Sequence, residues 1–259
     1  MKNLKLYSFS LTAKFGIFPD PTITTNKVTY YLPNKTQIIG LLGAIIGIKR
    51  GIEENNLYSK EFVNFLNSTK IGIKMENLPE KMVFFTNHIS LKKRGAKPFK
   101  TELLINPKLK IYFTTSEKYE NEIKDRISDG INKITKKGYY YTPYLGNAYC
   151  LANLNNLKYE GSDTEYKKLN KKNLEGEYFN INSIFIQPAE DVEYYEIKDK
   201  SLIMEYHLLH ILNSDKLNVK VVKYYAPYPQ KSAISVQIQD YNEGICEFYQ
   251  HNSELLCLF

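Results

Sequence analysis

Tryptophan is absent from the 259-residue sequence, and cysteine, histidine and arginine are scarce. The three cysteines form no CxxC pair and have no histidine at metal-ligand spacing, so neither a disulfide framework nor a structural zinc site is expected and a reducing compartment fits. The longest apolar run covers the eleven residues 38–48, whereas a membrane-spanning helix needs about 20. The first residues carry no apolar signal core and no small-residue cleavage site. We therefore expect a cytoplasmic protein with no membrane partner.

Basic residues outnumber acidic ones by seven, but the excess is concentrated in one stretch. Of the 35 basic residues 32 are lysines, and a sequence rich in Lys, Asn, Ile and Tyr is also typical of an AT-rich genome, so the total charge says little about function. Residues 92–110, in contrast, hold seven basic residues and one acid, a net charge of +6. These basic residues are Lys92, Lys93, Arg94, Lys97, Lys100, Lys108 and Lys110.

The basic stretch is predicted to form a projecting hairpin. Extended runs at 82–90 and 105–115 flank the turn at 92–98, and Phe99, Tyr112 and Phe113 are interleaved with the cations. Such a hairpin offers positive charge to phosphates and aromatic surfaces to bases. The alternative is a solvated edge hairpin that its lysines keep soluble. The concentration of charge favours nucleic acid, and we predict RNA binding by the seven cations together with Phe99.

The periodicity of apolar residues predicts a βαββαβ order in the first 153 residues. The predicted strands are 4–14, 69–75, 82–90, 105–115 and 139–153, and the predicted helices are 34–50, 57–66 and 116–134. This order indicates an α+β, ferredoxin-like (RRM-like) domain at 1–153 with a protruding basic β-hairpin thumb at about 80–115. Residues 154–259 are predicted to form a smaller β-rich C-terminal domain, interrupted by one helix at 201–212.

The helix predicted at 34–50, with Gly51 as its end, contains Gly40, Gly43 and Gly47 on one face. Each glycine costs about 1 kcal/mol relative to alanine inside a helix. The favoured interpretation is that this face packs closely against the sheet. The alternative, a loop that cradles phosphate, is not supported by the spacing, which matches neither the dinucleotide-binding nor the P-loop pattern.

Residues capable of catalysis are few. His207 and His210 lie three apart near Glu205 without a third metal ligand, and the acidic run 190–196 is typical of a solvated face. His88, with Lys110 and Tyr112, is the one local set that offers a general base for RNA cleavage. No nucleophile or kinase motif is present. We therefore expect no catalytic residue, no metal and no cofactor, and a metal-independent endoribonuclease stays open as an alternative.

Three stretches resemble the CRISPR-associated Cas-five family. YYLP at 30–33 is followed by TQIIGLLGAIIG at 36–47, which is similar to the signature that ends the first loop and begins the first helix of that family. KPFKTE at 97–102 and YTPYLGN at 141–147 are similar to two further landmarks in the same order. The resemblance covers about the first 150 residues, and the last 100 or so hold no diagnostic motif.

The resemblance implies a subunit of a type I CRISPR surveillance complex (Cascade), a member of the RAMP superfamily that acts in antiviral defence. Such subunits grip the 5′ repeat-derived handle of the crRNA, contact the backbone subunit and the large subunit, and meet target DNA only indirectly. One member of the family processes precursor RNA itself, which keeps the nuclease alternative open. A third hypothesis, from another class, is a protein-interaction domain without specific RNA binding.

Overall fold

A computed structural model describes most of the chain as a mixed α+β, strand-rich protein. The described residues are 5–23, 26–51, 58–89, 95–135, 139–159, 166–189, 195–198, 201–213, 216–230, 233–239, 245–251 and 254–259. They contain three α-helices and sixteen strands. The predicted α+β class is confirmed. None of the described helices combines the length and apolar composition that a bilayer crossing requires.

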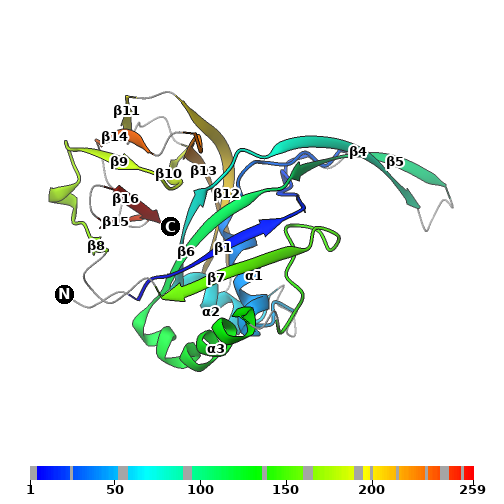
Figure 1. The fold of residues 1–259 in the computed structure, drawn as a ribbon, viewed down its shortest axis with the longest axis horizontal. Coiled ribbons are helices and arrows are strands. Elements are labelled where there is room, and N and C mark those ends of the chain that lie inside the picture. Colours follow the sequence, from blue (N-terminus) through cyan, green and yellow to red (C-terminus); the bar gives the residue numbers. More distant parts are fainter. Residues whose placement is uncertain are drawn as a thin grey trace.

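A four-stranded antiparallel sheet forms the N-terminal part. It consists of β1 (Tyr7–Ala13), β3 (Thr69–Met75), β6 (Lys108–Thr115) and β7 (Ala152–Tyr159) in the order β3-β6-β1-β7. Alternate residues such as Phe9 and Ile111 are buried because successive strand side chains point to opposite faces. Figure 1 shows the helices α1 (Lys35–Ile46), α2 (Lys60–Ser68) and α3 (Glu117–Thr135) gathered on one side of this sheet.

Local chemistry sets the ends of α1. The side chain of Asn34 accepts from the backbone N–H of Gln37 at 2.9 Å, and the Gln37 side chain accepts from the Asn34 N–H, a reciprocal capping box. The helix ends at Gly47, whose φ of 79° is the left-handed conformation typical of glycine at a helix C-terminus. The predicted end at Gly51 is therefore wrong by about one turn.

Two other predicted elements are corrected. Residues 201–212 are not helical: from Leu202 onwards they lie in β12 (Leu202–Asn213), which is paired along its whole length with β13 (Lys216–Pro227). Burial alternates along β12, since Ile203 and Leu209 are buried whereas Met204 and Tyr206 are exposed. The strand predicted at 139–153 starts only at Ala152, so β7 crosses the predicted domain boundary and residues 139–151 are irregular.

The C-terminal half is built from two further sheets. A three-stranded sheet has the order β10-β13-β12, and a six-stranded sheet has the order β11-β14-β9-β16-β15-β8. Their remaining strands are β8 (Lys167–Lys168), β9 (Tyr178–Ile181), β10 (Phe185–Pro188), β11 (Tyr195–Ile197), β14 (Ile234–Ile238), β15 (Glu247–His251) and β16 (Glu254–Leu258).

One hydrophobic core runs through both halves of the chain. Phe259 pairs with the edge strand β3, because it exchanges two backbone hydrogen bonds of 2.9 Å with Ile71. Ile184 donates to the carbonyl of Ile73 at 2.7 Å. A methyl group on Gly72 would lie 2.7 Å from Leu258, so the C-terminal strands pack directly on this part of the first sheet.

The buried carboxylate of Glu205 joins β12 to the chain that leads into α1. It accepts hydrogen bonds from the backbone N–H groups of Tyr31 at 2.7 Å and Leu32 at 3.1 Å, and it lies 3.3 Å from Nε2 of His207. The His207 ring stacks on Tyr224 and contacts Tyr30, so it is enclosed by aromatic rings rather than by metal ligands. Among the described residues no group of three His, Cys, Asp or Glu side chains is arranged to hold a metal ion.

Glu205→Ala is expected to lower the free energy of unfolding by about 3–5 kcal/mol. The substitution leaves two backbone N–H groups without their acceptor in a buried site and removes the partner of His207. Urea denaturation measures the loss. Lys220→Ala, at an exposed position of β13, is the control and should change stability by less than about 0.5 kcal/mol. Equal stability of Glu205→Ala and this control would contradict the structural role of the carboxylate.

Glu247 forms a second tie between the two halves of the chain. Its carboxylate lies 2.8 Å from the ammonium groups of Lys70 on β3 and Lys168 on β8 and accepts from Tyr249 at 2.6 Å. Burial alone would raise the pKa of Glu247, but the hydrogen bonds from Lys168, Lys70 and Tyr249 outweigh it and lower the pKa to about 2.

The stabilising effect of Glu247 is expected to be lost in acid. A depressed folded-state pKa contributes stability above the unfolded-state value of about 4.3, and this contribution disappears as the pH falls towards 2. Between pH 6 and pH 2 the stability of the wild type should therefore fall by up to about 3 kcal/mol more than that of Glu247→Gln. Glu175→Gln, which removes an exposed ion pair with Lys171, should follow the wild-type curve. Parallel curves for wild type and Glu247→Gln would contradict the assignment.

Candidate nucleic-acid interface

A long two-stranded hairpin projects from the body of the protein (Figure 1). Its strands are β4 (Glu80–Ile89) and β5 (Ala96–Ile105), paired from Glu80 with Ile105 to Ile89 with Ala96. At about 3.3 Å per residue, nine steps give an arm of roughly 30 Å. Its inner part packs on the body, since Thr101, Leu103 and Leu104 are buried, whereas side chains of its outer part, such as Phe85 and Lys97, are exposed.

The base of the hairpin is held by the chain that precedes α1. β2 (Phe15–Gly16) pairs with the end of β5, and Lys27 exchanges backbone hydrogen bonds with Lys100 and Glu102. The ammonium group of Lys81 donates to the carbonyl of Thr29 at 2.6 Å and lies 4.2 Å from the centre of the Tyr31 ring. These contacts fix the arm where it leaves the body.

The structure divides the predicted basic cluster into two groups. Lys97 and Lys100 lie exposed on β5 with the half-buried Phe99 between them. The hairpin ends with β5 at residue 105 instead of at 115. Lys108 and Lys110 therefore lie on β6, in the middle of the four-stranded sheet. Lys92, Lys93 and Arg94 are outside the described residues.

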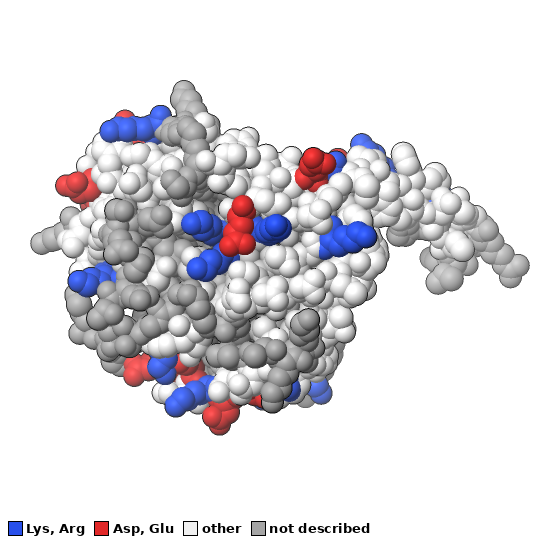
Figure 2. All heavy atoms as spheres, in the orientation of Figure 1, with Lys and Arg blue, Asp and Glu red and all other residues white. Residues whose placement is uncertain are grey.

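Lys110 belongs to a polar row across the first sheet. It pairs with Ser10 on β1 and Lys74 on β3, and Ser10 pairs in turn with Asn155 on β7. Residues paired directly across antiparallel strands share a face, so these four side chains lie on the side opposite Phe9 and Ile111. Figure 2 shows this side of the protein, where basic and acidic side chains are mixed and further cations lie near the base of the arm.

The aromatic residues of the interface differ from those predicted. Tyr112 and Phe113 are buried in the core and cannot stack with a base. Phe85 on β4, in contrast, is 73% exposed, and Val83 and Ile89 on the same face of the strand are exposed as well. Phe85 is paired directly with Lys100, so an aromatic ring and a cation lie side by side on the arm. The sequence does not distinguish this face, because residues 82–85 are all apolar and show no alternation.

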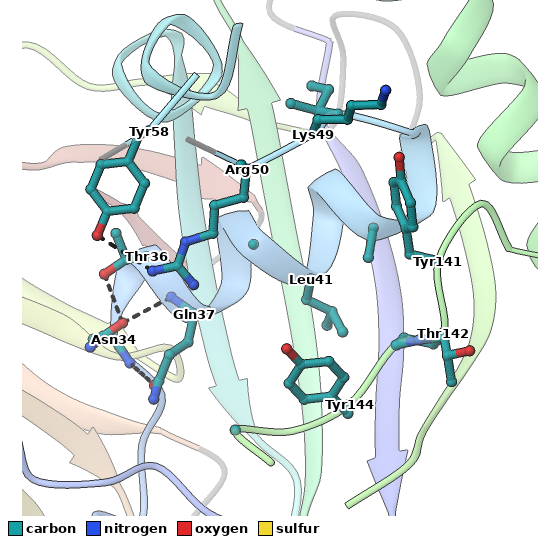
Figure 3. A pocket seen from close by; sticks show the side chains of 16 residues that line it. Asn34, Thr36, Gln37, Leu41, Lys49, Arg50, Tyr58, Tyr141, Thr142 and Tyr144 are labelled. Carbon is teal, nitrogen blue, oxygen red and sulfur yellow. Dashed lines mark hydrogen bonds between the residues drawn. The ribbon is translucent and has the colours of Figure 1, made fainter. Parts of the chain in front are cut away.

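A pocket lies over the outer face of α1 (Figure 3). Its volume is about 650 Å³, and residues of α1 and of the segment 141–146 line it together with Lys49, Arg50 and Tyr58. In the sequence α1 stands out through its three glycines, and both stretches stand out through the family resemblance. Arg50, Tyr141 and Tyr144 were not predicted as site residues, because about 90 residues of chain separate the arginine from the two tyrosines.

The glycines of α1 do not pack against the sheet as predicted. A methyl group on Gly40 would meet no atom within 4 Å, and Gly40 lines the pocket. On Gly43 it would make ordinary contact with the carbonyl oxygen of Ile48, at 3.4 Å, and Gly47 is the left-handed cap. The face that they share is open at Gly40, so the close-packing interpretation is wrong there.

The segment 139–151 is held as a fixed wall of the pocket. Tyr141 donates its backbone N–H to the carbonyl of Ala44 in α1 at 3.1 Å, and Leu145 accepts from Ile17 at 3.1 Å. Gly146 has a φ of 78°, and any side chain on it would collide with the carbonyl oxygen of Ile17. Glycine at 146 is therefore required both by the backbone conformation and by this close approach.

Comparison with known proteins gives similarities of structure only. No protein-family model matches the sequence, and no curated protein matches it. A chain of a "CRISPR RNA-guided surveillance complex" is 12% identical, with a TM-score of 0.48 over 88% of this chain and 91% of that one. A chain of the "Type III-B Cmr-beta bound to cognate target RNA and AMPPnP" is 12% identical, with a TM-score of 0.44 over 89% and 86%. A structure titled "Crystal structure of Cas protein" is 12% identical, with a TM-score of 0.43 over 89% and 100%.

Removal of Lys97 and Lys100 from the arm is expected to weaken RNA binding in a salt-dependent way. For the double variant Lys97→Ala/Lys100→Ala, the slope of log affinity against log salt should fall by about 0.7 for each phosphate that a lysine no longer neutralises. Phe85→Ala should reduce affinity without changing the slope, because stacking releases no counterions. Fluorescence anisotropy with single-stranded RNA at several salt concentrations measures both quantities.

The charge-matched control is Lys167→Ala/Lys171→Ala, which removes two lysines of the C-terminal half. It should leave the affinity close to that of the wild type. Equal losses of affinity in the two double variants would indicate diffuse electrostatics instead of a defined site on the arm.

Proposed function

We propose that the protein is an RNA-binding scaffold subunit of a type I CRISPR surveillance complex (Cascade) and grips the 5′ repeat-derived handle of the crRNA. The observation that carries the proposal is the projecting arm, on which Lys100 is paired with Phe85 on one face and Lys97 shares the other face with Phe99. Cations and aromatic rings along one exposed ribbon provide the two interactions that single-stranded RNA binding uses, neutralisation of phosphates and stacking of bases.

The strand order of the first sheet supports a ferredoxin-like domain. Taken in chain order, the four strands β1, β3, β6 and β7 are arranged as second, third, first, fourth, with α1 after the first and α3 after the third. This order supports the split βαβ motif that the sequence predicts. The position of the arm, between the second and third strands, supports the proposed thumb.

The resemblance of residues 30–47, 97–102 and 141–147 to the Cas-five family supports the more specific part of the proposal. In a cytoplasmic Cascade complex the protein would contact the crRNA handle, the neighbouring backbone subunit and the large subunit, and would meet target DNA indirectly. The alternative without RNA, a domain that only assembles with proteins, is separated from this proposal by the salt-dependent binding measurement above.

We propose that the subunit is not itself a nuclease. The suggested set of His88, Lys110 and Tyr112 is spread over two elements: His88 lies on β4 opposite Lys97, near the far end of the arm, whereas the other two lie on β6. Eight strand residues separate His88 from the base of the arm, roughly 26 Å. Tyr112 is buried among Leu6, Tyr249, Leu256 and Leu258. General acid–base catalysis requires groups within hydrogen-bond reach of one reacting atom, and this spacing does not favour it.

The isolated protein is therefore expected to bind labelled repeat RNA without cutting it. The RNA is incubated with the wild type and with His88→Ala, in EDTA and in magnesium, and the products are separated on a denaturing gel. Intact RNA in every lane, together with saturable binding, is the expected result. Cleavage at one position that is lost in His88→Ala would replace the scaffold proposal with the metal-independent endoribonuclease.

A further inference from the structure

The open face of α1 at Gly40 is not explained by the packing of the protein. Glycine inside a helix costs about 1 kcal/mol relative to alanine, and here a methyl group would meet nothing within 4 Å. Alanine would therefore be more stable at this position and would fit. A position where local stability is given up without a packing reason is typical of a functional site, and glycine is typical of places where a ligand approaches the backbone closely.

The walls around this open face combine aromatic rings with positive charge. Tyr141 and Tyr144 are 45% and 50% exposed and lie near α1, whereas Arg50 and Tyr58 lie near its N-terminal half (Figure 3). The guanidinium of Arg50 is held over the Tyr58 ring at 5.2 Å. Lys49 is a second cation of the lining, with its side chain pointing away from that of Arg50 (Figure 3), and no acidic side chain is among the described residues that line the pocket.

The floor of the pocket is apolar. Gly40, Leu41 and Ala44 of α1 line it, together with Ile48 just beyond the end of the helix. A volume of about 650 Å³ is within the range of small-molecule sites, about 300–1,000 Å³. The wall at 141–146 is preformed, because it is bonded to Ala44 and to Ile17.

We propose that this pocket binds one nucleotide, with its base between α1 and the rings of Tyr141 and Tyr144 and its phosphate facing Arg50. A base is planar and stacks on tyrosine, and a phosphate pairs with a guanidinium through parallel hydrogen bonds. This proposal rests on the proposed function, because the nucleotide is then one residue of the bound RNA, unstacked from its neighbours. A free mononucleotide has the same chemistry, and the experiment distinguishes the two sources.

Filling the pocket tests the proposal without disturbing the core. Gly40→Leu places a side chain in open space and replaces a poor helix former with a good one, so its melting temperature should equal or exceed that of the wild type. Its affinity for single-stranded RNA should fall about tenfold or more, the effect of losing one stacked base. Gly43→Ala is the matched control, since it improves the same helix at a position outside the pocket.

The measurements are anisotropy with labelled RNA octamers of each base and calorimetry with AMP, GMP, CMP and UMP. Weaker RNA binding by Gly40→Leu, with Gly43→Ala at the wild-type level, supports a nucleotide of the RNA as the occupant. If Gly40→Leu does not fold, Tyr144→Ala replaces it, because that half-exposed ring can be removed without opening the core.

The other outcomes separate this inference from the proposed function. If Gly40→Leu binds RNA as tightly as the control while Lys97→Ala/Lys100→Ala binds it more weakly, the pocket proposal is overturned and the RNA-binding proposal stands. If the wild type binds no RNA but binds a mononucleotide that Gly40→Leu does not, the nucleotide site stands with a free nucleotide as its ligand. Binding of neither RNA nor mononucleotides overturns both proposals.

Discussion

The chain between Lys27 and Leu32 is the junction that the rest of the structure is built around. On one side Glu205 of β12 accepts hydrogen bonds from the backbone of Tyr31 and Leu32. On the other side Lys27 pairs with β5, and Lys81 of β4 donates to Thr29. This short segment therefore connects the C-terminal sheet, the base of the arm and the start of α1. Because a buried carboxylate holds it, the position of each of these three parts constrains the other two.

This junction explains how the two candidate surfaces are placed together. The arm is fixed at its base by residues 27–29, and α1, which forms the floor of the pocket, begins a few residues later with its capping box at Asn34. The segment 139–151 completes the arrangement: Tyr141 is bonded to α1 at Ala44, and the ring of Tyr149 contacts Phe84 of the arm edge to face. An RNA strand lying on the arm would therefore have the pocket wall next to the base of the arm.

Charge and exposure carry different information about the interface. The concentration of cations in 92–110 is a property of the sequence, but two of its lysines lie on a central strand of the sheet and two on the arm. Of the aromatic residues near these cations in sequence, Tyr112 and Phe113 are core residues and Phe99 is half-buried. The exposed ring, Phe85, comes from the other strand of the hairpin and meets Lys100 only through strand pairing. Charge density identified the region, and strand register determined which side chains act together.

Local patterns in the sequence were sufficient for the α+β class, for the three helices of the first half and for the cap at Asn34, because each depends on residues a few positions apart. They were not sufficient where a distant partner decides. Residues 202–213 have helix-compatible spacing, yet they form a strand because β13 pairs with all of them. Residues 139–151 are rich in tyrosine, which is typical of strands. They are nevertheless irregular, because Gly146 and the hydrogen bonds to α1 and Ile17 hold them as the wall of the pocket. The pocket itself joins residues 34–58 to residues 141–146. No local pattern links two segments so far apart, so only the tertiary structure shows that the open glycine, the arginine and the tyrosines share one site.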